Sequence, residues 1–315
     1  MRAVWLTGLG GPEVLVAGEA PDPAPGDGRA LVAVEFANIT FVETQMRAGG
    51  PSPFTVEPPV IPGNGVGGVV TAVGAGADPA LVGRRVVSAT GGSGGYAELA
   101  AVDAAGVFEV PDGLALDDAV ALLADGRTAT MMLRAAGPRP GERVLVEAAA
   151  GGVGTLLVQL AKAAGAVVVA AVGGARKAEV ARGLGADEVV DYREPGWTAG
   201  VGAVDVVFDG VGGGVAREAF TLLRGGGRMV SFGLASGEWA QVPEGDAAAR
   251  GVTLVRPEAT PEEMRGFTET VLADAARGMV RPLIGQRYPL ADAAGAHAAI
   301  ESRATVGKTL LEVRR

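Results

Sequence analysis

The chain has 315 residues, of which 48% are hydrophobic, and it carries a formal net charge of −9 with a pI near 4.9. Length and apolar content suffice for two domains, each with its own core. The acidic balance and the lack of any Lys/Arg block exclude a basic nucleic-acid-binding face.

The residue types present exclude several kinds of catalytic and metal-binding chemistry. The chain has no cysteine, which excludes disulfides, thiolate catalysis and cysteine-bound metal. Its N-terminus, MRAVWLTGLG, lacks the pattern of a signal peptide, and no apolar run approaches the roughly 20 residues of a membrane helix. We therefore expect a cytoplasmic protein.

The first 117 residues show an antiparallel β pattern. Short Val-rich segments alternate with Gly/Pro clusters, which is typical of a rolled sheet or barrel. The predicted strands are Arg29 to Asn38, Gly68 to Val73, Arg85 to Ala89, Tyr96 to Ala101 and Val107 to Val110. Gly-rich loops at 49–65 and 91–95 are expected to line the active cleft. From Asp117 to Ala136 the apolar period becomes helical.

Residues 143–177 predict one βαβ unit with glycines at its first turn. An apolar run from Val144 to Val146 is followed by Gly151, Gly152 and Gly154, then by a helical pattern and a second apolar strand, Val167 to Val172. Such a turn points backbone N–H groups and the positive end of a helix dipole at a diphosphate. Because a glycine triplet alone is a weak signal, the strand and helix around it carry the prediction, and a tight turn without a ligand stays open.

The end of the second strand indicates which dinucleotide binds. NAD-binding folds place an acid about 20 residues past the glycines to hold the ribose 2′-hydroxyl. Here the residues are Gly173, Gly174, Ala175, Arg176 and Lys177. Two cations and no acid suit a 2′-phosphate, which favours NADP(H). The alternative is that both cations are simply solvated at a helix start.

The α/β alternation continues after Lys177. We predict a helix from Arg176 to Leu184, strands at Glu188 to Asp191 and Val204 to Asp209, a helix from Val215 to Arg224 and a strand from Gly227 to Phe232. This alternation predicts a parallel, doubly wound sheet with its ligand at the carboxyl ends of the strands. The residues near those ends include Asp209 to Gly212 and Phe232 to Leu234, with Tyr192 near the adenosine.

The C-terminal part contains a predicted helix from Pro261 to Arg277, a short strand around Tyr288, an Ala-rich helix and a last strand, Lys308 to Val313. The pattern leaves open whether these extend the nucleotide domain or return to the first. The single histidine, His297, has no Ser or acid constellation beside it. We expect it to be a structural or surface residue.

The chain resembles the zinc-independent quinone oxidoreductases, the ζ-crystallin-like branch of the medium-chain dehydrogenase/reductase superfamily, in the segments AAAGGVGTLLVQLAKAAGA, LGADEVVDYRE, VVFDGVGG, GGRMVSFG and GKTLLEV. The resemblance covers essentially the whole chain. It implies an α/β fold in which a Rossmann doubly wound parallel sheet, residues 118–256, is inserted into a GroES-like β-rich catalytic domain of residues 1–117 and 257–315. It also implies NADP(H) as cofactor and a homodimer.

The resemblance assigns a cofactor site. The implied phosphate turn is Gly151, Gly152, Val153 and Gly154; the 2′-phosphate contacts are Gly173, Lys177 and Tyr192, with Arg176 beside them; the nicotinamide-side loop is Ser231, Phe232, Gly233 and Leu234; and Lys308 lies in the GK motif. Arg256 matches an arginine near the family's active cleft.

Two departures from the family concern the chemistry. Where zinc-dependent relatives carry ligands, this chain has Pro62-Gly63-Asn64-Gly65, so no metal is expected. The family's Asn-x-x-Asp-x-Tyr run falls on Thr40, Glu43 and Gln45. The candidate active-site residues, which could donate hydrogen bonds to the acceptor, are Asn38, Thr40, Gln45, Thr128 and Arg256, with Arg127 as a further donor. The alternative is that Asn38 and Thr40 cap strand ends and that Arg127 is an exposed helix cation.

The leading hypothesis is an NADPH-dependent reductase that transfers hydride to a quinone or other small, apolar α,β-unsaturated carbonyl, with the proton supplied by solvent. A reductase of enoyl thioesters or alkenes in secondary metabolism is the rival within the enzyme class. A non-catalytic NADPH-binding sensor is the rival outside it, favoured by the residues at Thr40 and Gln45.

Overall fold

The computed structural model describes residues 1–50 and 55–314. The chain divides into two compact units, which we call the first unit (Met1–Ala124 with Leu272–Arg315) and the second unit (Asp125–Val271). The divisions fall inside two helices, α2 (Leu116–Ala136) and α7 (Pro261–Ala276). The domain boundaries implied by the resemblance, 117/118 and 256/257, stay a prediction.

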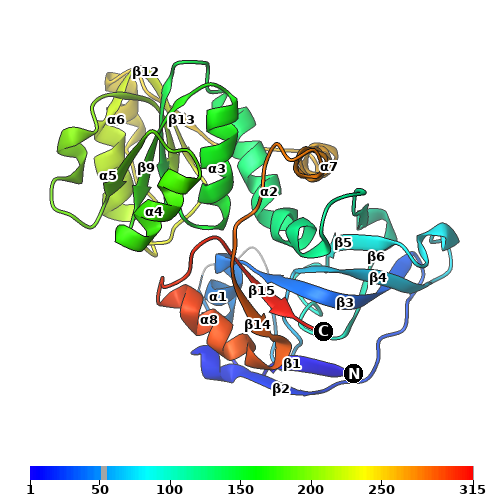
Figure 1. Ribbon diagram of the computed structural model, residues 1–315. Coiled ribbons are helices and arrows are strands. Elements are labelled where there is room, and N and C mark those ends of the chain that lie inside the picture. The colour runs from blue at the N-terminus through cyan, green and yellow to red at the C-terminus, as the bar shows by residue number, and fades with distance from the viewer. Residues whose placement is uncertain (51–54, 315) are drawn as a thin grey trace. The chain divides into compact units, whose positions relative to one another are not determined.

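The second unit alternates strands and helices along the chain. Its strands are β8 (Arg143–Glu147), β9 (Val167–Val172), β10 (Glu188–Asp191), β11 (Val204–Asp209), β12 (Leu223–Ser231) and β13 (Thr253–Val255), and its helices are α3 (Gly152–Ala163), α4 (Ala175–Gly183), α5 (Gly213–Thr221) and α6 (Glu244–Ala249). The strands form one parallel sheet in the order β10-β9-β8-β11-β12-β13 (Figure 1).

The strand order of this sheet reverses between β8 and β11. Right-handed crossovers in the two directions place α3 and α4 on one face and α5 and α6 on the other. The central strands are buried on both faces, with Val144, Leu145 and Val146 each 0% exposed, as their continuous apolar run predicts. The predicted doubly wound Rossmann sheet is confirmed.

The first unit is rich in strands. These are β1 (Arg2–Leu6), β2 (Leu15–Glu19), β3 (Arg29–Ile39), β4 (Gly65–Val73), β5 (Arg85–Ala89), β6 (Leu99–Asp103), β7 (Phe108–Glu109), β14 (Ile284–Pro289) and β15 (Lys308–Glu312), with helices α1 (Phe41–Ala48) and α8 (Ala293–Glu301). Seven of the strands form one sheet in the order β14-β15-β3-β4-β5-β7, with β6 also on β3, while β1 and β2 pair separately (Figure 1).

The C-terminal segment therefore returns to the first unit. β15 pairs antiparallel with β3, with Thr309 opposite Ile39, and Leu311 and Val313 join the same apolar core as Val32 and Val34. The question that the residue pattern left open is settled by this pairing.

Several predicted elements are shifted. The strand expected at Tyr96 to Ala101 runs from Leu99 to Asp103, because Tyr96 turns its ring into the core. The helix expected to reach Arg224 ends at Thr221, and β12 begins at Leu223, which pairs with Val204. Part of the loop predicted at 49–65, residues 51–54, lies outside the described residues. No helix in the part of the chain that the structure describes is long and apolar enough to cross a membrane.

Candidate cofactor and active site

The phosphate turn joins β8 to α3 through residues 148–151. Gly154 N–H belongs to the first turn of α3, where backbone N–H groups lack intrahelical partners and can bind an anion. A Cβ on Gly154 would lie 2.2 Å from the Ala148 carbonyl oxygen, so glycine is required for the helix to pack on the strand. Gly151, the N-cap, contributes no side chain to the turn, and its backbone N–H donates to the Ala148 carbonyl at 2.8 Å. The turn thus has the open backbone of a diphosphate site.

Helix α2 supplies polar groups beside this turn. A Cβ on Gly152 would lie 1.9 Å from the Asp125 carboxylate, so Asp125 reaches the start of α3. Thr128 follows Asp125 by three residues and therefore shares its helix face. Arg127 is half-buried, burial lowers its pKa, and among the described residues its Nε has no hydrogen-bond partner. The sequence interpretation named Thr128 and Arg127 but missed Asp125.

The end of β9, which is expected to hold the 2′-phosphate, lies close to the residues that follow β10. A Cβ on Gly173 would lie 3.1 Å from the Tyr192 hydroxyl, and one on Gly174 would lie 2.7 Å from the Arg193 guanidinium. β10 is parallel to β9 with Asp191 opposite Val172, and this register places the residues after β10 beside Gly173 and Gly174. The structure therefore brings Gly173 and Tyr192 together, as the resemblance implies.

Arg193 is a cation that the sequence interpretation missed. Asp191 fixes it through hydrogen bonds of 3.0 Å from Nε to Oδ1 and 2.7 Å from Nη2 to Oδ2. The hydrogen bonds to Arg193 lower the pKa of Asp191, and those to Asp191 raise the pKa of Arg193. The Asp-x-Arg spacing directly after a strand was the available signal.

The charges around the start of α4 point to an anion. Arg176 and Lys177 lie in its first turn, which contains no acidic residue. Arg193, which Asp191 holds over Gly174, adds a third basic residue at the same helix start. Three basic residues beside a helix N-terminus fit a 2′-phosphate.

The nicotinamide-side residues form two interlocked loops, 210–212 after β11 and 232–236 after β12. Phe232 N–H donates to the Asp209 carbonyl at 2.9 Å and Ser236 N–H to the Val211 carbonyl at 2.8 Å. A Cβ on Gly233 would lie 2.6 Å from the Gly210 carbonyl oxygen, so the close approach requires glycine there. Ser231 Oγ donates to Asp209 at 2.7 Å. These contacts keep Ser231 to Leu234 at the carboxyl end of the sheet.

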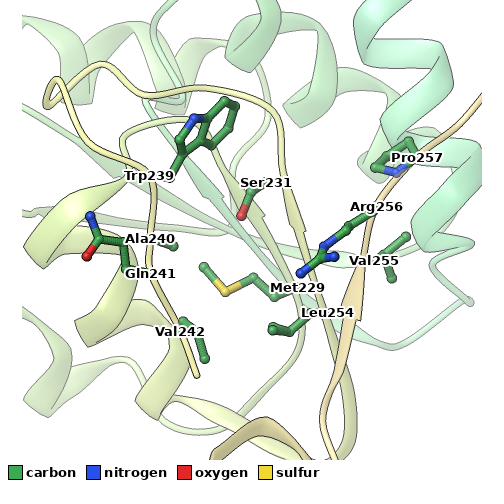
Figure 2. Close-up of a pocket in the computed structure, with 10 residues that line it drawn as sticks. All are labelled: Met229, Ser231, Trp239, Ala240, Gln241, Val242, Leu254, Val255, Arg256 and Pro257. Carbon is green, nitrogen blue, oxygen red and sulfur yellow. The ribbon is translucent and has the colours of Figure 1, made fainter. Parts of the chain in front are cut away.

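A cavity of about 450 Å³ opens beside Ser231 in the second unit (Figure 2). Arg256, from the end of β13, extends into it, and its guanidinium bonds to Glu244 at 2.9 Å with the side chain 79% exposed. Trp239 and Gln241 line it as well. The structure thus brings Arg256 and Ser231 to one cavity, and the sequence interpretation missed Trp239 and Gln241.

The remaining predicted residues lie in the first unit. Thr40 caps α1 and is held by Glu43, whose Oε2 accepts from the Thr40 N–H at 2.6 Å and from its hydroxyl at 2.8 Å. Glu43 Oε1 accepts from the Asn64 N–H at 2.9 Å. Burial raises the pKa of Glu43, while the bonds from Thr40 and the charge of Lys308 oppose this rise. Glu43 therefore joins α1 to the loop before β4.

Three further predicted residues belong to the first unit: Lys308, Asn38 and Gln45. Lys308 is 4% exposed at the start of β15 and belongs to the first unit, whereas the other predicted cofactor residues belong to the second, and its cofactor role stays a prediction. Asn38 is 1% exposed, and within the described residues its Oδ1 has no partner. Gln45 is half-buried on α1, with its amide oxygen near Gly50.

His297 is a structural residue, as predicted. It is 1% exposed, and its Nε2 lies 2.9 Å from the Tyr96 hydroxyl. Burial and the charge of Arg47 lower its pKa to about 3, which keeps the ring neutral. Such a group cannot serve as a general acid at neutral pH.

Two family descriptions match the chain. "Alcohol dehydrogenase GroES-like domain" matches residues 26–112, which confirms the predicted GroES-like unit, and "zinc-binding dehydrogenase" matches residues 184–311. Among residues 1–50 and 55–314, no group of three or more His, Cys, Asp or Glu side chains could hold a metal ion. The residues present do not fit the zinc of the second description.

The chain is similar over almost its whole length to curated proteins. It is 35% identical to a quinone oxidoreductase of Salmonella typhimurium, with 96% of each chain covered, and 33% identical to a 2-haloacrylate reductase of a Burkholderia species, with 96% of each covered. It superimposes on the Escherichia coli quinone oxidoreductase solved in complex with NADPH with a TM-score of 0.90 and 33% identity, covering 99% of this chain and 100% of that one. The chain therefore belongs to the quinone oxidoreductase, ζ-crystallin-like family of the medium-chain dehydrogenase/reductase superfamily.

Proposed function

We propose that the chain is an NADPH-dependent reductase that transfers hydride to a quinone or other α,β-unsaturated carbonyl without a metal. The observation that carries the proposal is the presence of Arg176, Lys177 and Arg193 around the start of α4, a helix whose first turn contains no acidic residue. The NADPH bound to the E. coli relative supports the same cofactor.

The residues divide the work of binding. Gly152, Val153 and Gly154 would hold the diphosphate with backbone N–H groups, and Gly151, whose N–H donates to Ala148, would border it without a side chain. Gly173, Arg176, Lys177, Tyr192 and Arg193 would hold the 2′-phosphate. Ser231 to Leu234 would border the nicotinamide. When bound, the cofactor supplies the hydride.

The chain's own contribution to the chemistry is to position the acceptor and stabilise negative charge on its oxygen. Asn38, Gln45, Thr128 and Arg256 are the proposed donors, and the stabilisation acts because their hydrogen bonds strengthen as charge develops. Thr40, whose hydroxyl and N–H both donate to Glu43, would border the acceptor without donating to it. No side chain is assigned as proton donor, since the single histidine is neutral and buried. Water then supplies the proton.

A second candidate is the reduction of an alkene conjugated to a carboxylate or thioester. The 2-haloacrylate reductase of Burkholderia favours it, because that name describes a substrate with a conjugated carbon–carbon double bond. The same residues would hold the cofactor in either case.

The proposal is tested by following NADPH consumption with a panel of acceptors: a benzoquinone, phenanthrenequinone, an enone and an enoyl thioester. Turnover with the quinones or the enone supports the leading function, and turnover confined to the thioester supports the second candidate. NADPH binding without turnover on any acceptor would replace both with a sensor role.

We also propose that the protein is a homodimer, as the family resemblance implies. β13 is an end strand of the sheet in the second unit, and an end strand offers unpaired backbone groups to another chain. Light scattering after gel filtration checks this, and a monomeric mass would contradict it.

A further inference from the structure

Two acidic side chains meet where the strand order of the second unit reverses. Glu147 is the last residue of β8 and Asp209 the last residue of β11, and these strands are neighbours in the sheet. Both residues are 0% exposed, and both carboxyl groups accept from the same Val211 N–H, Glu147 at 3.1 Å and Asp209 at 3.2 Å. We call Glu147 and Asp209 the carboxyl pair. Open α/β sheets bind their ligands above this crossing point, so the pair lies directly beneath the expected cofactor.

Asp209 accepts more hydrogen bonds from its surroundings than Glu147 does. Asp209 Oδ1 accepts from the N–H groups of Gly212 at 2.7 Å and Val211 at 3.2 Å, and its Oδ2 accepts from the Ser231 hydroxyl at 2.7 Å. Glu147 Oε2 accepts from the Val211 N–H at 3.1 Å. Glu147 Oε1 is buried and has no donor within the described residues.

A proton accounts for this arrangement. Ionised carboxyl groups only accept hydrogen bonds, so two of them that converge on one N–H have no donor between them unless one carries a proton. Glu147 is the better place for it, because Asp209 already uses its oxygens to accept three hydrogen bonds. Two charged carboxylates in contact would repel strongly in the interior.

We propose that the carboxyl pair holds one proton and thereby positions the two loops that border the cofactor, residues 210–212 and 232–236. This inference rests on the proposed NADPH function, and it makes Glu147 and Asp209 positioning residues. Loss of the proton should loosen both loops and weaken the binding of NADPH.

Hydrogen bonds connect the carboxyl pair to the first loop, residues 210–212, and further hydrogen bonds connect it to the second, residues 232–236. The Val211 N–H lies between Glu147 and Asp209 and donates to each. The Asp209 backbone carbonyl accepts from Phe232, and Val211 accepts from Ser236 at 2.8 Å. Repulsion between Glu147 and Asp209 would therefore move the first loop and, through these bonds, the second.

The surrounding elements do not neutralise the pair. β9 contains no charged residue. Charged groups elsewhere on the packed elements have partners at the opposite ends of the strands: Arg143 with Glu188, Arg224 with Asp205, Arg228 with Glu142, and Lys162 with Asp187. The others on these elements are Arg217 and Glu218 on α5, and Asp117, Asp118, Asp125, Arg127 and Arg134 on α2.

The sign of the pH dependence follows from the pKa. Burial and then the charge of Asp209 raise the pKa of Glu147 well above its ordinary range, and the N–H groups of Val211 and Gly210 oppose this. The folded chain therefore keeps a proton that the unfolded chain releases. Stability falls as pH rises from the ordinary glutamic acid pKa through the raised one.

The first experiment measures thermal unfolding without cofactor at several pH values, for the wild type and for Glu147→Gln. The glutamine amide donates to Asp209 and its carbonyl accepts from Val211, so it mimics the protonated acid without titrating. We expect Glu147→Gln to be as stable as the wild type at low pH and more stable as pH rises. Parallel curves, or a variant less stable at every pH, would overturn the proposal.

The second experiment measures NADPH dissociation constants by fluorescence from about pH 6 to about pH 9. We expect the wild type to lose roughly tenfold in affinity, the effect of one pKa unit of coupling, and Glu147→Gln to stay nearly constant. Glu142→Gln is the matched control, because Glu142 precedes β8 and pairs with Arg228 instead. It should keep the wild-type dependence of binding on pH.

These outcomes separate the two claims. Equal dependence of binding on pH in the wild type and Glu147→Gln would refute the positioning role while leaving the NADPH function intact. A failure of the wild type to bind NADPH at any pH would refute the function, and the unfolding curves would still decide whether the pair holds a proton.

Discussion

At the scale of single residues, Arg193 is the residue that we propose distinguishes NADPH from NADH. Replacing it with alanine removes a charged donor that Asp191 fixes over Gly174. A hydrogen bond to a charged group contributes about 1.5–3 kcal/mol, so we expect Arg193→Ala to weaken NADPH at least tenfold. NADH, which lacks the phosphate, should be nearly unaffected.

Fluorescence titration with both cofactors checks this prediction. Arg224→Ala is a suitable control, because Arg224 is another exposed arginine of the second unit and pairs with Asp205 away from Gly174. Equal weakening of NADPH and NADH in Arg193→Ala would show that the 2′-phosphate lies elsewhere.

Gly154 is the residue on which the phosphate turn depends sterically. An added Cβ meets the Ala148 carbonyl oxygen at 2.2 Å, and backbone atoms on both sides must move. We expect Gly154→Ala to lower the free energy of unfolding by about 1–3 kcal/mol and to weaken NADPH. Urea unfolding and cofactor titration measure both effects.

Gly183 provides the matched control for Gly154. It also lies in a helix of the second unit, but a Cβ there meets nothing within 4 Å. Gly183→Ala should leave cofactor binding unchanged and stabilise the protein by about 0.5–1 kcal/mol. If both variants behaved alike, the packing argument for Gly154 would be wrong.

Part of the site was predictable residue by residue. The glycine turn, Lys177 and Tyr192 follow from spacing, because the βαβ unit fixes what lies at the strand ends. Arg193, Asp125 and Trp239 were missed, since their positions depend on a parallel register, a neighbouring helix and a loop path that spacing does not encode.

At the scale of elements, the cap of α1 shows how a buried acid can organise a site. Glu43 accepts hydrogen bonds from two groups of Thr40 and from the Asn64 N–H. A glutamine in its place would turn an amide N–H toward at least one of these donors. We expect Glu43→Gln to cost about 1–3 kcal/mol of unfolding free energy, the penalty of a donor left unsatisfied.

The same substitution thus has opposite expected results at two buried glutamates. Glu147 faces a carboxylate and gains from an amide, whereas Glu43 faces N–H and O–H donors and loses. Thermal unfolding of Glu43→Gln at neutral pH measures the effect, and an unchanged melting temperature would show that the cap contributes little.

Elements with an apolar period were predictable and those without it were not. β9 and β11 match the predicted bounds, because buried strands are largely apolar runs that end at glycines or charges. β10, a half-buried end strand, also matches its predicted bounds. Helix α1 buries Glu43, Thr44 and Arg47 beside Met46, so its inner face is polar and a hydrophobic pattern cannot reveal it. β1 and β2 form a separate two-stranded sheet, and bridges from Ala3 to Ala97 and from Leu6 to Val60 join β1 to other segments.

At the scale of the whole molecule, the sequence pattern predicted the β-rich unit and the Rossmann sheet but left open which of them contains the C-terminal segment. The change from short Val-rich strands to βαβ units separates the β-rich unit from the Rossmann sheet. The return of the C-terminal strand to β3 rests on the pairing of Thr309 with Ile39, a contact between distant residues that composition and period do not contain.

The cofactor preference of the intact enzyme tests the central claim most directly. The decisive measurement compares kcat/KM for NADPH and NADH, in parallel, with one benzoquinone as acceptor. We expect turnover with a kcat/KM at least tenfold higher for NADPH than for NADH, because about 1.4 kcal/mol of binding energy from the 2′-phosphate gives a factor of ten. Equal rates with both cofactors, or a preference for NADH, would contradict it.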